Sequence, residues 1–125
     1  MRVSDIMNKV IAIEEKTTVK EAAKIMAERG IGSVIVLKGD NIKGIITDRD
    51  ILRNIGKSSK KVSAIMSQNV VTVDENESID NAAIIMAEND IKKLPVVGNG
   101  KIVGIITSTD LIKNSDSLNL DFLLD

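Results

Sequence analysis

Cysteine and histidine are both absent from this sequence of 125 residues. Without cysteine there is no disulfide, thiolate metal site or thiol nucleophile, and without histidine the commonest general base and transition-metal ligand are missing. Trp and Tyr are absent too, and Phe122 is the single aromatic residue, so aliphatic side chains must build the core. This composition disfavours an enzyme, and we expect neither a required cofactor nor a metal site.

Long apolar runs and blocks of like charge are also absent. No run approaches the roughly 18 apolar residues of a membrane helix, and the N-terminal sequence MRVSDIMNKV lacks the apolar centre of a signal peptide. The formal net charge is −1, with acids and bases interspersed, which disfavours nucleic acid as a partner. These features predict a soluble, cytoplasmic protein of one domain without a membrane partner.

An internal duplication organises the chain. A shift of about sixty positions aligns Val10–Arg53 with Val70–Lys113 without a gap, and VSDIM near the N-terminus recurs as VSAIM, one residue out of register. We expect the first repeat at residues 1–56, a polar flexible linker at 57–61, the second repeat at 62–113 and a tail at 114–125. The tail either covers an apolar surface or frays; its apolar residues are Leu118, Leu120, Phe122, Leu123 and Leu124.

Each repeat has the pattern β-α-β-β-α. Short β-prone runs at 10–13 and 70–73 precede amphipathic segments. The first of these segments begins at a capping box of Thr18 with Glu21, and the second runs from Ser78 to Asn89. Gly30 fits the end of the first of these helices. The turn sequences KGDN and GNGK then separate two strands in each repeat. The pattern predicts an α/β fold whose two β-α-β-β-α repeats pack sheet against sheet with pseudo-two-fold symmetry.

The sequence GIIT-x-x-D closes both repeats, at Gly44–Asp50 and at Gly104–Asp110. In one interpretation the threonine caps a helix, and the aspartate at the third helical position completes a capping box. In the other, the junction of strand and helix holds a ligand. Free N–H groups at the start of a helix suit phosphate, and a carboxylate can accept hydrogen bonds from both ribose hydroxyls. The second interpretation predicts a ribose–phosphate ligand.

The repeats resemble the CBS domain, a module named after cystathionine β-synthase that usually occurs in pairs. The resemblance rests on the DIM and AIM starts, on TVKEAAKIMAERGIGSVIVL and on LPVV with GKIVGIITSTD, and extends from about Arg2 to Lys113. It implies a regulatory tandem pair, a Bateman-type module, that binds AMP, ADP, ATP or S-adenosylmethionine in clefts between the repeats. Such a module would signal occupancy to an effector protein, which the sequence does not identify. The resemblance also implies a homodimer, for which the extra apolar Ile84 is suited.

By the same resemblance, Asp50 and Asp110 contact the ribose. Lys92 and Lys93 precede a strand where the first repeat has Gly32 and Ser33, so the Asp110 site is the better phosphate site. The candidates for phosphate and hydroxyl contacts are Thr47, Arg49, Thr107, Ser108, Thr109, Lys92 and Lys93. The candidates for the adenine pocket are Asn69, Val70, Ile91 and Leu94, of which Val70 and Leu94 also suit core packing.

Other functional classes stay open at this point. One is a structural or dimerisation module whose clefts have lost their ligand; the melting temperature with and without nucleotides discriminates it. A nucleic-acid-binding member of the family is another, and an enzyme acting on a nucleotide is a third. For the enzyme, Asp48 and Asp50 could hold Mg²⁺ with phosphates, but no nucleophile or general base is evident.

Overall fold

The computed structural model describes residues 1–114, which fall into two compact units. Ile11–Val70 form the first-repeat unit, and Met1–Val10 with residues 71–114 form the second-repeat unit. The predicted tail lies, apart from Asn114, outside the described residues, so the role suggested for its leucines stays a prediction.

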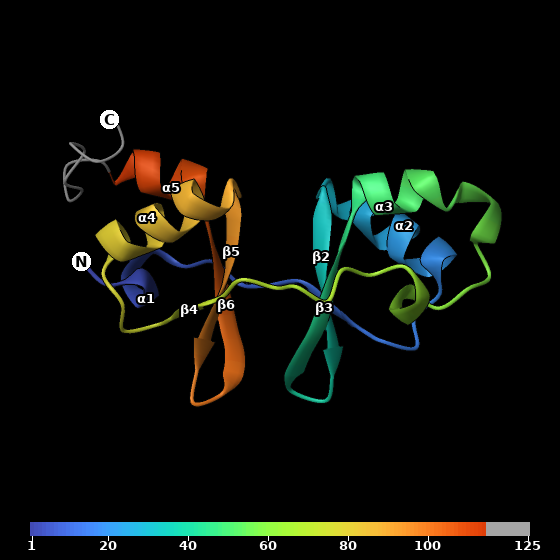
Figure 1. Ribbon diagram of the computed structural model, residues 1–125, viewed down its shortest axis with the longest axis horizontal. Helices are drawn as coiled ribbons and strands as arrows, with labels where there is room; N and C mark the ends of the chain where they lie inside the picture. The colour runs from blue at the N-terminus through green and yellow to red at the C-terminus, as the bar shows by residue number, and fades with distance from the viewer. Residues whose placement is uncertain (115–125) are drawn as a thin grey trace. The chain divides into compact units, whose positions relative to one another are not determined.

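The first-repeat unit is a three-stranded mixed sheet with helices against one face (Figure 1). The strand order is β1-β2-β3, in which β1 is parallel and β3 antiparallel to the central β2. Its elements are β1 (Ala12–Glu14), α2 (Val19–Arg29), β2 (Ser33–Lys38), β3 (Asn41–Thr47), α3 (Asp48–Arg53) and the short 3₁₀ helices η1 (Ile55–Lys57) and η2 (Val62–Ala64).

The second-repeat unit has the same architecture, with strand order β4-β5-β6 and the same parallel and antiparallel pairs. The predicted β-α-β-β-α order is therefore confirmed in both repeats, as is the α/β fold class. Its elements are α1 (Val3–Ile6), β4 (Val73–Asp74), α4 (Ile79–Asn89), β5 (Lys93–Gly98), β6 (Lys101–Thr107) and α5 (Ser108–Lys113). No helix of the described region is both long and apolar enough to cross a membrane.

The two helix signals predicted for the first repeat, Thr18 and Gly30, are confirmed. Thr18 precedes α2, where its side chain accepts a hydrogen bond from the N–H of Glu21 (3.1 Å), and Gly30 ends the helix in the left-handed conformation with φ 63°. Ser78 caps α4 in the same way. Asp90 ends α4 with φ 52°, a conformation that aspartate tolerates better than most residues because of its short polar side chain.

Aliphatic side chains from one face of each sheet and from its helices form a separate core in each unit. This follows from the alternation of strand residues and the apolar stripe of each helix. The first-repeat core contains Ile13, Ala22, Met26, Val34, Val36, Ile46 and Val62. The second-repeat core contains Val3, Val73, Ile79, Ala82, Ala83, Met86, Leu94, Val96, Ile106 and Leu111.

The segments that lead into the repeats are exchanged between the units. Val3 of α1 is 0% exposed in the second-repeat core, and its N–H donates to the carbonyl of Glu77 (2.8 Å). Val62 of η2 occupies the matching position in the first-repeat core, and its N–H donates to the carbonyl of Thr17 (2.7 Å). The compact units thus differ in composition from the sequence repeats at 1–56 and 62–113.

The region of the predicted flexible linker is hydrogen-bonded to α2. The N–H of Val19 donates to the carbonyl of Lys60 (2.7 Å), and the N–H of Lys20 donates to that of Ser58 (3.0 Å). The first N–H groups of a helix have no partner within the helix. The linker satisfies two of them, so it is hydrogen-bonded within the first-repeat unit, and its flexibility stays a prediction.

The first strand of each repeat is shorter than predicted and begins later. β1 covers Ala12–Glu14 where 10–13 was expected, and β4 covers Val73–Asp74 where 70–73 was expected. The chain passes from one unit to the other at residues 10–11 and again at 70–71. Because these residues connect the two units, the strands begin only after them.

Gly44 and Gly104 allow a close backbone approach in each unit. Residues Asn8 and Ile105 exchange two main-chain hydrogen bonds of 2.8 and 3.0 Å beside Gly104. A Cβ on Gly104 would lie 2.9 Å from the carbonyl oxygen of Asn8. Ser67 and Ile45 pair in the same way beside Gly44. The glycine of the closing motif is therefore required by this extra chain segment along the sheet.

Candidate functional site

The capping interpretation of the closing motif is confirmed in both repeats. Thr107 donates to Asp110 Oδ2 through its N–H (2.8 Å) and its hydroxyl (2.8 Å), and Thr107 Oγ1 accepts from the N–H of Asp110 (3.2 Å). Thr47 and Asp50 make the same three hydrogen bonds, of 2.9, 3.1 and 3.2 Å. Each pair forms a capping box, which fixes the aspartate at the junction of strand and helix.

The capping box leaves half of each carboxylate available. All the hydrogen bonds found for the side chains of Asp50 and Asp110 within residues 1–114 go to Oδ2. Both aspartates are half-buried, and Oδ1 of each can still accept from a ligand. Capping and ligand binding are therefore compatible at the same residue. The hydroxyls of Thr47 and Thr107, in contrast, already donate to the carboxylates.

The expected cluster of free N–H groups at the start of each last helix is wrong for α3. The N–H of Asp48 donates to the carbonyl of Gly32 (2.9 Å), that of Arg49 to Asp48 Oδ1 (2.8 Å), and that of Asp50 to Thr47 Oγ1 (3.2 Å). In α5 the first and third N–H groups are bound in the same way, whereas no acceptor for the N–H of Thr109 is found among the described residues. The two junctions therefore differ.

The structure brings the predicted phosphate contacts of the second repeat together. Lys93 opens β5 and pairs in register with Thr107 at the end of β6. The N–H of Ser108 donates to the carbonyl of Lys92 (2.9 Å), which ties the start of α5 to the two lysines. Thr109 and Lys92 are exposed, and Ser108 and Lys93 are half-buried. The main chain thus brings Lys92 and Lys93 next to Thr107 and Ser108, at the junction where Asp110 completes the capping box.

The residues predicted for the adenine pocket come from both units. Asn69 and Val70 belong to the first-repeat unit, with Asp50, whereas Ile91 and Leu94 belong to the second-repeat unit, with Asp110. Leu94 is 0% exposed and lies in the second-repeat core. This confirms core packing, the alternative role given for Leu94 in the sequence analysis. Ile91 is half-buried against the same core, and Asn69 is exposed.

Asn8 is a site residue that the sequence interpretation missed. Its side-chain N–H donates to Asp110 Oδ2 over 2.7 Å. The residue lies at the N-terminus, in the segment that pairs with β6. The sequence feature that pointed to this segment is the pair VSDIM and VSAIM, which recurs one residue out of register with the rest of the duplication. It shows that the segment at the start of each repeat is itself repeated.

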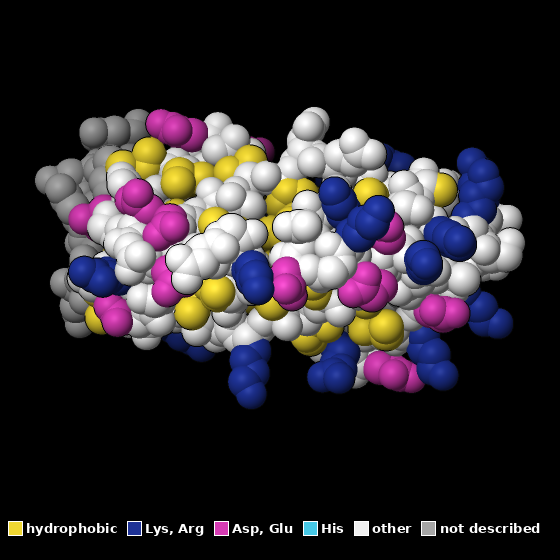
Figure 2. Space-filling view, turned by 90° about the horizontal axis from the view of Figure 1, so that it is seen from below, with side chains coloured by type: hydrophobic (Ala, Val, Ile, Leu, Met, Phe, Trp, Pro, Cys, Tyr) yellow, Lys and Arg dark blue, Asp and Glu magenta, His cyan; other side chains and the backbone are white. Residues whose placement is uncertain are grey.

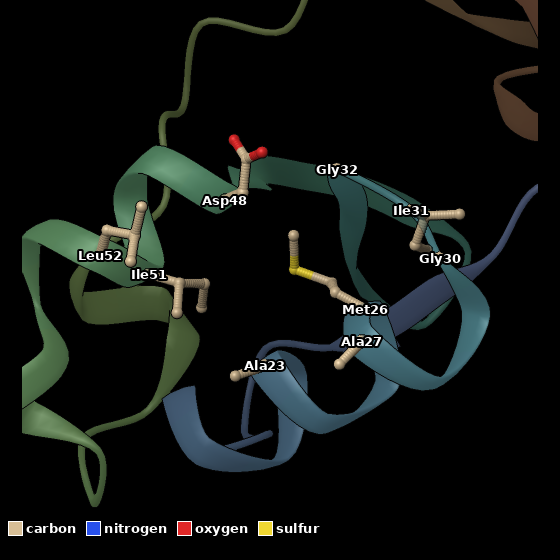
Figure 3. A pocket seen from close by; sticks show the side chains of 9 residues that line it. All are labelled: Ala23, Met26, Ala27, Gly30, Ile31, Gly32, Asp48, Ile51 and Leu52. Atoms are coloured by element: carbon tan, nitrogen blue, oxygen red, sulfur yellow. The ribbon is translucent and has the colours of Figure 1, made fainter.

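A pocket of about 440 Å³ lies between α2 and α3 in the first-repeat unit. Figure 3 shows that its walls are apolar apart from Asp48, at the start of α3. Neither Thr47 nor Asp50 lines it, so it is separate from the predicted ribose contact. Asp48 lines this pocket beside Gly32. The lining residues are Ala23, Met26, Ala27, Gly30, Ile31, Gly32, Asp48, Ile51 and Leu52.

Comparison with protein families identifies the repeats. The model of the CBS domain matches residues 3–57 and again residues 62–117. A CBS domain-containing protein of Bacillus subtilis, YhcV, is 34% identical over 120 residues, covering 92% of this chain and 86% of its own length. A protein of Methanocaldococcus jannaschii, MJ1232, is 38% identical over 115 residues, but this chain covers 90% of itself and only 39% of that protein.

A solved structure with the same fold carries ligands. It is the CBS domain pair of protein MJ0100 in complex with 5′-methylthioadenosine and S-adenosyl-L-methionine. Its TM-score is 0.79 and its sequence identity 32%, over 93% of this chain and 96% of that one. Both of its ligands contain adenosine.

Proposed function

The chain belongs to the CBS-domain family, and on that premise we propose that it is a regulatory module that binds an adenosine-containing ligand. The observation that carries the proposal is the MJ0100 pair, which is similar along nearly its whole length and holds two adenosyl ligands. In this proposal, Asp110 and Asp50 bind the ribose, and occupancy is passed to an effector protein of unidentified nature. The role is binding, with no chemical step.

The capping boxes support the ribose contact. A ligand-binding carboxylate works best when its position is fixed before the ligand arrives, because no ordering cost is then added on binding. Thr107 fixes Asp110 through two hydrogen bonds to Oδ2 of 2.8 Å each, and Oδ1 is left to accept from a sugar hydroxyl. The equivalent arrangement holds Asp50.

The phosphate preference of the two contacts is proposed to differ. Near Asp110, Lys92 and Lys93 supply positive charge and Thr109 supplies a hydroxyl and a main-chain N–H, which suits a phosphate group. Near Asp50, Arg49 is the basic candidate, but its main-chain N–H already donates to the carboxylate of Asp48. We therefore assign AMP, ADP or ATP to the Asp110 contact, and to the Asp50 contact a less anionic ligand such as S-adenosylmethionine.

The adenine contacts follow the units. Ile91, half-buried beside the lysines, is proposed for the ligand of Asp110, and Asn69 and Val70 for the ligand of Asp50, within whose unit they lie. A ligand that prefers one conformation of the module shifts its population toward that conformation. This shift is the signal that an effector protein would read. The cytoplasmic location stays a prediction.

A homodimer is the second part of the proposal. Leu52 and Ile112 occupy equivalent positions of α3 and α5, and their exposed fractions are 67% and 71%; Ile55 is 75% exposed. We expect the wild-type mass of a dimer by light scattering, and a monomer for Leu52→Asp combined with Ile112→Asp, because the charges would be buried without partners. Val103→Asp, at an exposed apolar residue of β6, is the control that stays dimeric. A monomeric wild type would contradict the proposal.

Thermal unfolding with ligands tests the proposed function. At about a hundred times its dissociation constant, a ligand adds roughly 2.7 kcal/mol to the free energy of unfolding and raises the melting temperature. We expect such a rise with at least one of AMP, ADP, ATP and S-adenosylmethionine. The rise with the anionic nucleotides should disappear in Asp110→Ala and persist in Asp50→Ala. Because both variants lose a capping box, each ligand shift is measured against the same variant without ligand.

The outcome also decides between the alternative functions. If no ligand shifts the melting temperature of the folded wild type, the closing motif is a helix cap only and the chain is a structural or dimerisation module. A nucleic-acid-binding role is less well supported, because acidic and basic side chains are interspersed on the face drawn in Figure 2 and such a role favours a basic face.

A further inference from the structure

We infer that Asn8 is a specificity-determining residue of the Asp110 site, where its carboxamide and the Asp110 carboxylate together recognise the vicinal hydroxyls of a ribose. The inference rests on the proposed function and extends it in two ways. It adds a residue from the N-terminal segment to the site. It also predicts that the two sites differ in how strongly they discriminate a ribonucleotide from its 2′-deoxy form.

The main chain of Asn8 is held firmly against β6. The N–H of Asn8 donates to the carbonyl of Ile105 (2.8 Å), and the N–H of Ile105 donates back to the carbonyl of Asn8 (3.0 Å). Gly104 makes this approach possible, because any Cβ there would meet Met7 and Asn8. The segment is anchored at its other side by Val3, which is 0% exposed. Asn8 therefore reaches Asp110 from a fixed backbone.

The side chain of Asn8 complements what the carboxylate lacks. Its Nδ2 donates to Asp110 Oδ2 over 2.7 Å, and this leaves one amide N–H and the amide oxygen for a ligand. An ionised carboxylate only accepts hydrogen bonds, whereas a carboxamide both donates and accepts. One ribose hydroxyl can donate to Asp110 Oδ1 while its neighbour bonds to the carboxamide. Asn8 is exposed, so a ligand can reach these groups.

The first-repeat unit supplies a natural comparison. Ser67 occupies the equivalent position, and it exchanges main-chain hydrogen bonds of 2.9 and 3.0 Å with Ile45. Within the described residues, no side-chain hydrogen bond joins Ser67 to Asp50. The backbone frame is thus repeated, while the carboxamide is present in the second-repeat unit only. The Asp50 site would hold the sugar through its carboxylate alone.

Reciprocal substitutions test the inference in the full chain. Asn8→Ser is made in the Asp50→Ala background, so that only the Asp110 site reports, and Ser67→Asn is made in the Asp110→Ala background. Calorimetric titrations compare ATP with 2′-deoxyATP at the Asp110 site. At the Asp50 site, to which a less anionic ligand is assigned, they compare S-adenosylmethionine with its 2′-deoxy form. Hydrogen exchange at the Ile105 amide shows in parallel whether the pairing with residue 8 persists.

We expect Asn8→Ser to weaken ATP binding about threefold to tenfold, the value of one or two hydrogen bonds. The ratio of ATP to 2′-deoxyATP affinity at the Asp110 site should fall toward one, and Ser67→Asn should raise the ratio of S-adenosylmethionine to 2′-deoxy-S-adenosylmethionine affinity at the Asp50 site. A merely structural role would weaken both nucleotides equally, so an unchanged ratio overturns the inference while the proposed function stands. If the wild type binds neither ATP nor 2′-deoxyATP, both the inference and the proposed function are overturned for adenine nucleotides.

Discussion

Leu94→Ala is expected to lower the free energy of unfolding by about 2–5 kcal/mol, the usual range for removing a fully buried leucine side chain. Leu94 lies in β5, is 0% exposed, and belongs to the cluster that includes Ile79 and Ile106. Loss of its side chain removes buried apolar contacts and leaves a cavity that the surrounding strands can fill only in part. The measurement is equilibrium unfolding in urea, with the midpoint and slope compared with those of the wild type.

Ligand affinity separates a core role from a role in an adenine pocket. Because the Leu94 side chain has no exposed surface, the folded fraction of Leu94→Ala should bind its adenosyl ligand with unchanged affinity. Ile91→Ala is the matched comparison, since Ile91 is half-buried at the same end of the unit, and we expect a smaller loss of stability with a measurable loss of affinity. A stable Leu94→Ala protein that no longer binds would contradict this assignment.

The fold was predictable from local sequence features. Thr18 and Ser78 mark the starts of α2 and α4, Gly30 marks the end of α2, and the KGDN and GNGK turns place the hairpins. Each of these signals acts between residues close in sequence, so it is readable without the structure. The duplication then extends one assignment to both halves. The capping box of Asp110 with Thr107, separated by three residues, belongs to the same class.

The composition of the two units was not predictable in the same way. Val3 and Val62 begin nearly identical sequences, VSDIM and VSAIM. Val3 nevertheless packs in the second-repeat core and Val62 in the first-repeat core, so neither packs with the repeat that it begins in the sequence. A repeated sequence shows which segments are alike, but it does not say which copy a segment contacts. The bond from Asn8 to Asp110 follows from this exchange and joins residues 102 positions apart, beyond the reach of any spacing argument.

Gly104→Ala is expected to lower the free energy of unfolding by about 1–3 kcal/mol, the usual cost of forcing extra atoms into a packed site. The new Cβ would lie 2.8 Å from Met7 Sδ and 2.9 Å from the carbonyl oxygen of Asn8. The methionine side chain can move, but the carbonyl can move only with its backbone. That movement would break the pairing of Asn8 with Ile105, whose bonds are 2.8 and 3.0 Å.

The displaced segment would also carry Asn8 away from Asp110, so the substitution couples stability to ligand binding. Hydrogen exchange should show lost protection at the amides of Asn8 and Ile105, with β5 and β6 still paired, and nucleotide affinity at the Asp110 site should fall with it. Gly56→Ala is the control: no atom lies within 4 Å of its added Cβ, so its stability should change by less than about 0.5 kcal/mol. If Gly104→Ala matched this control, the glycine would not be needed for the close approach, and the closing motif would owe its glycine to some other constraint.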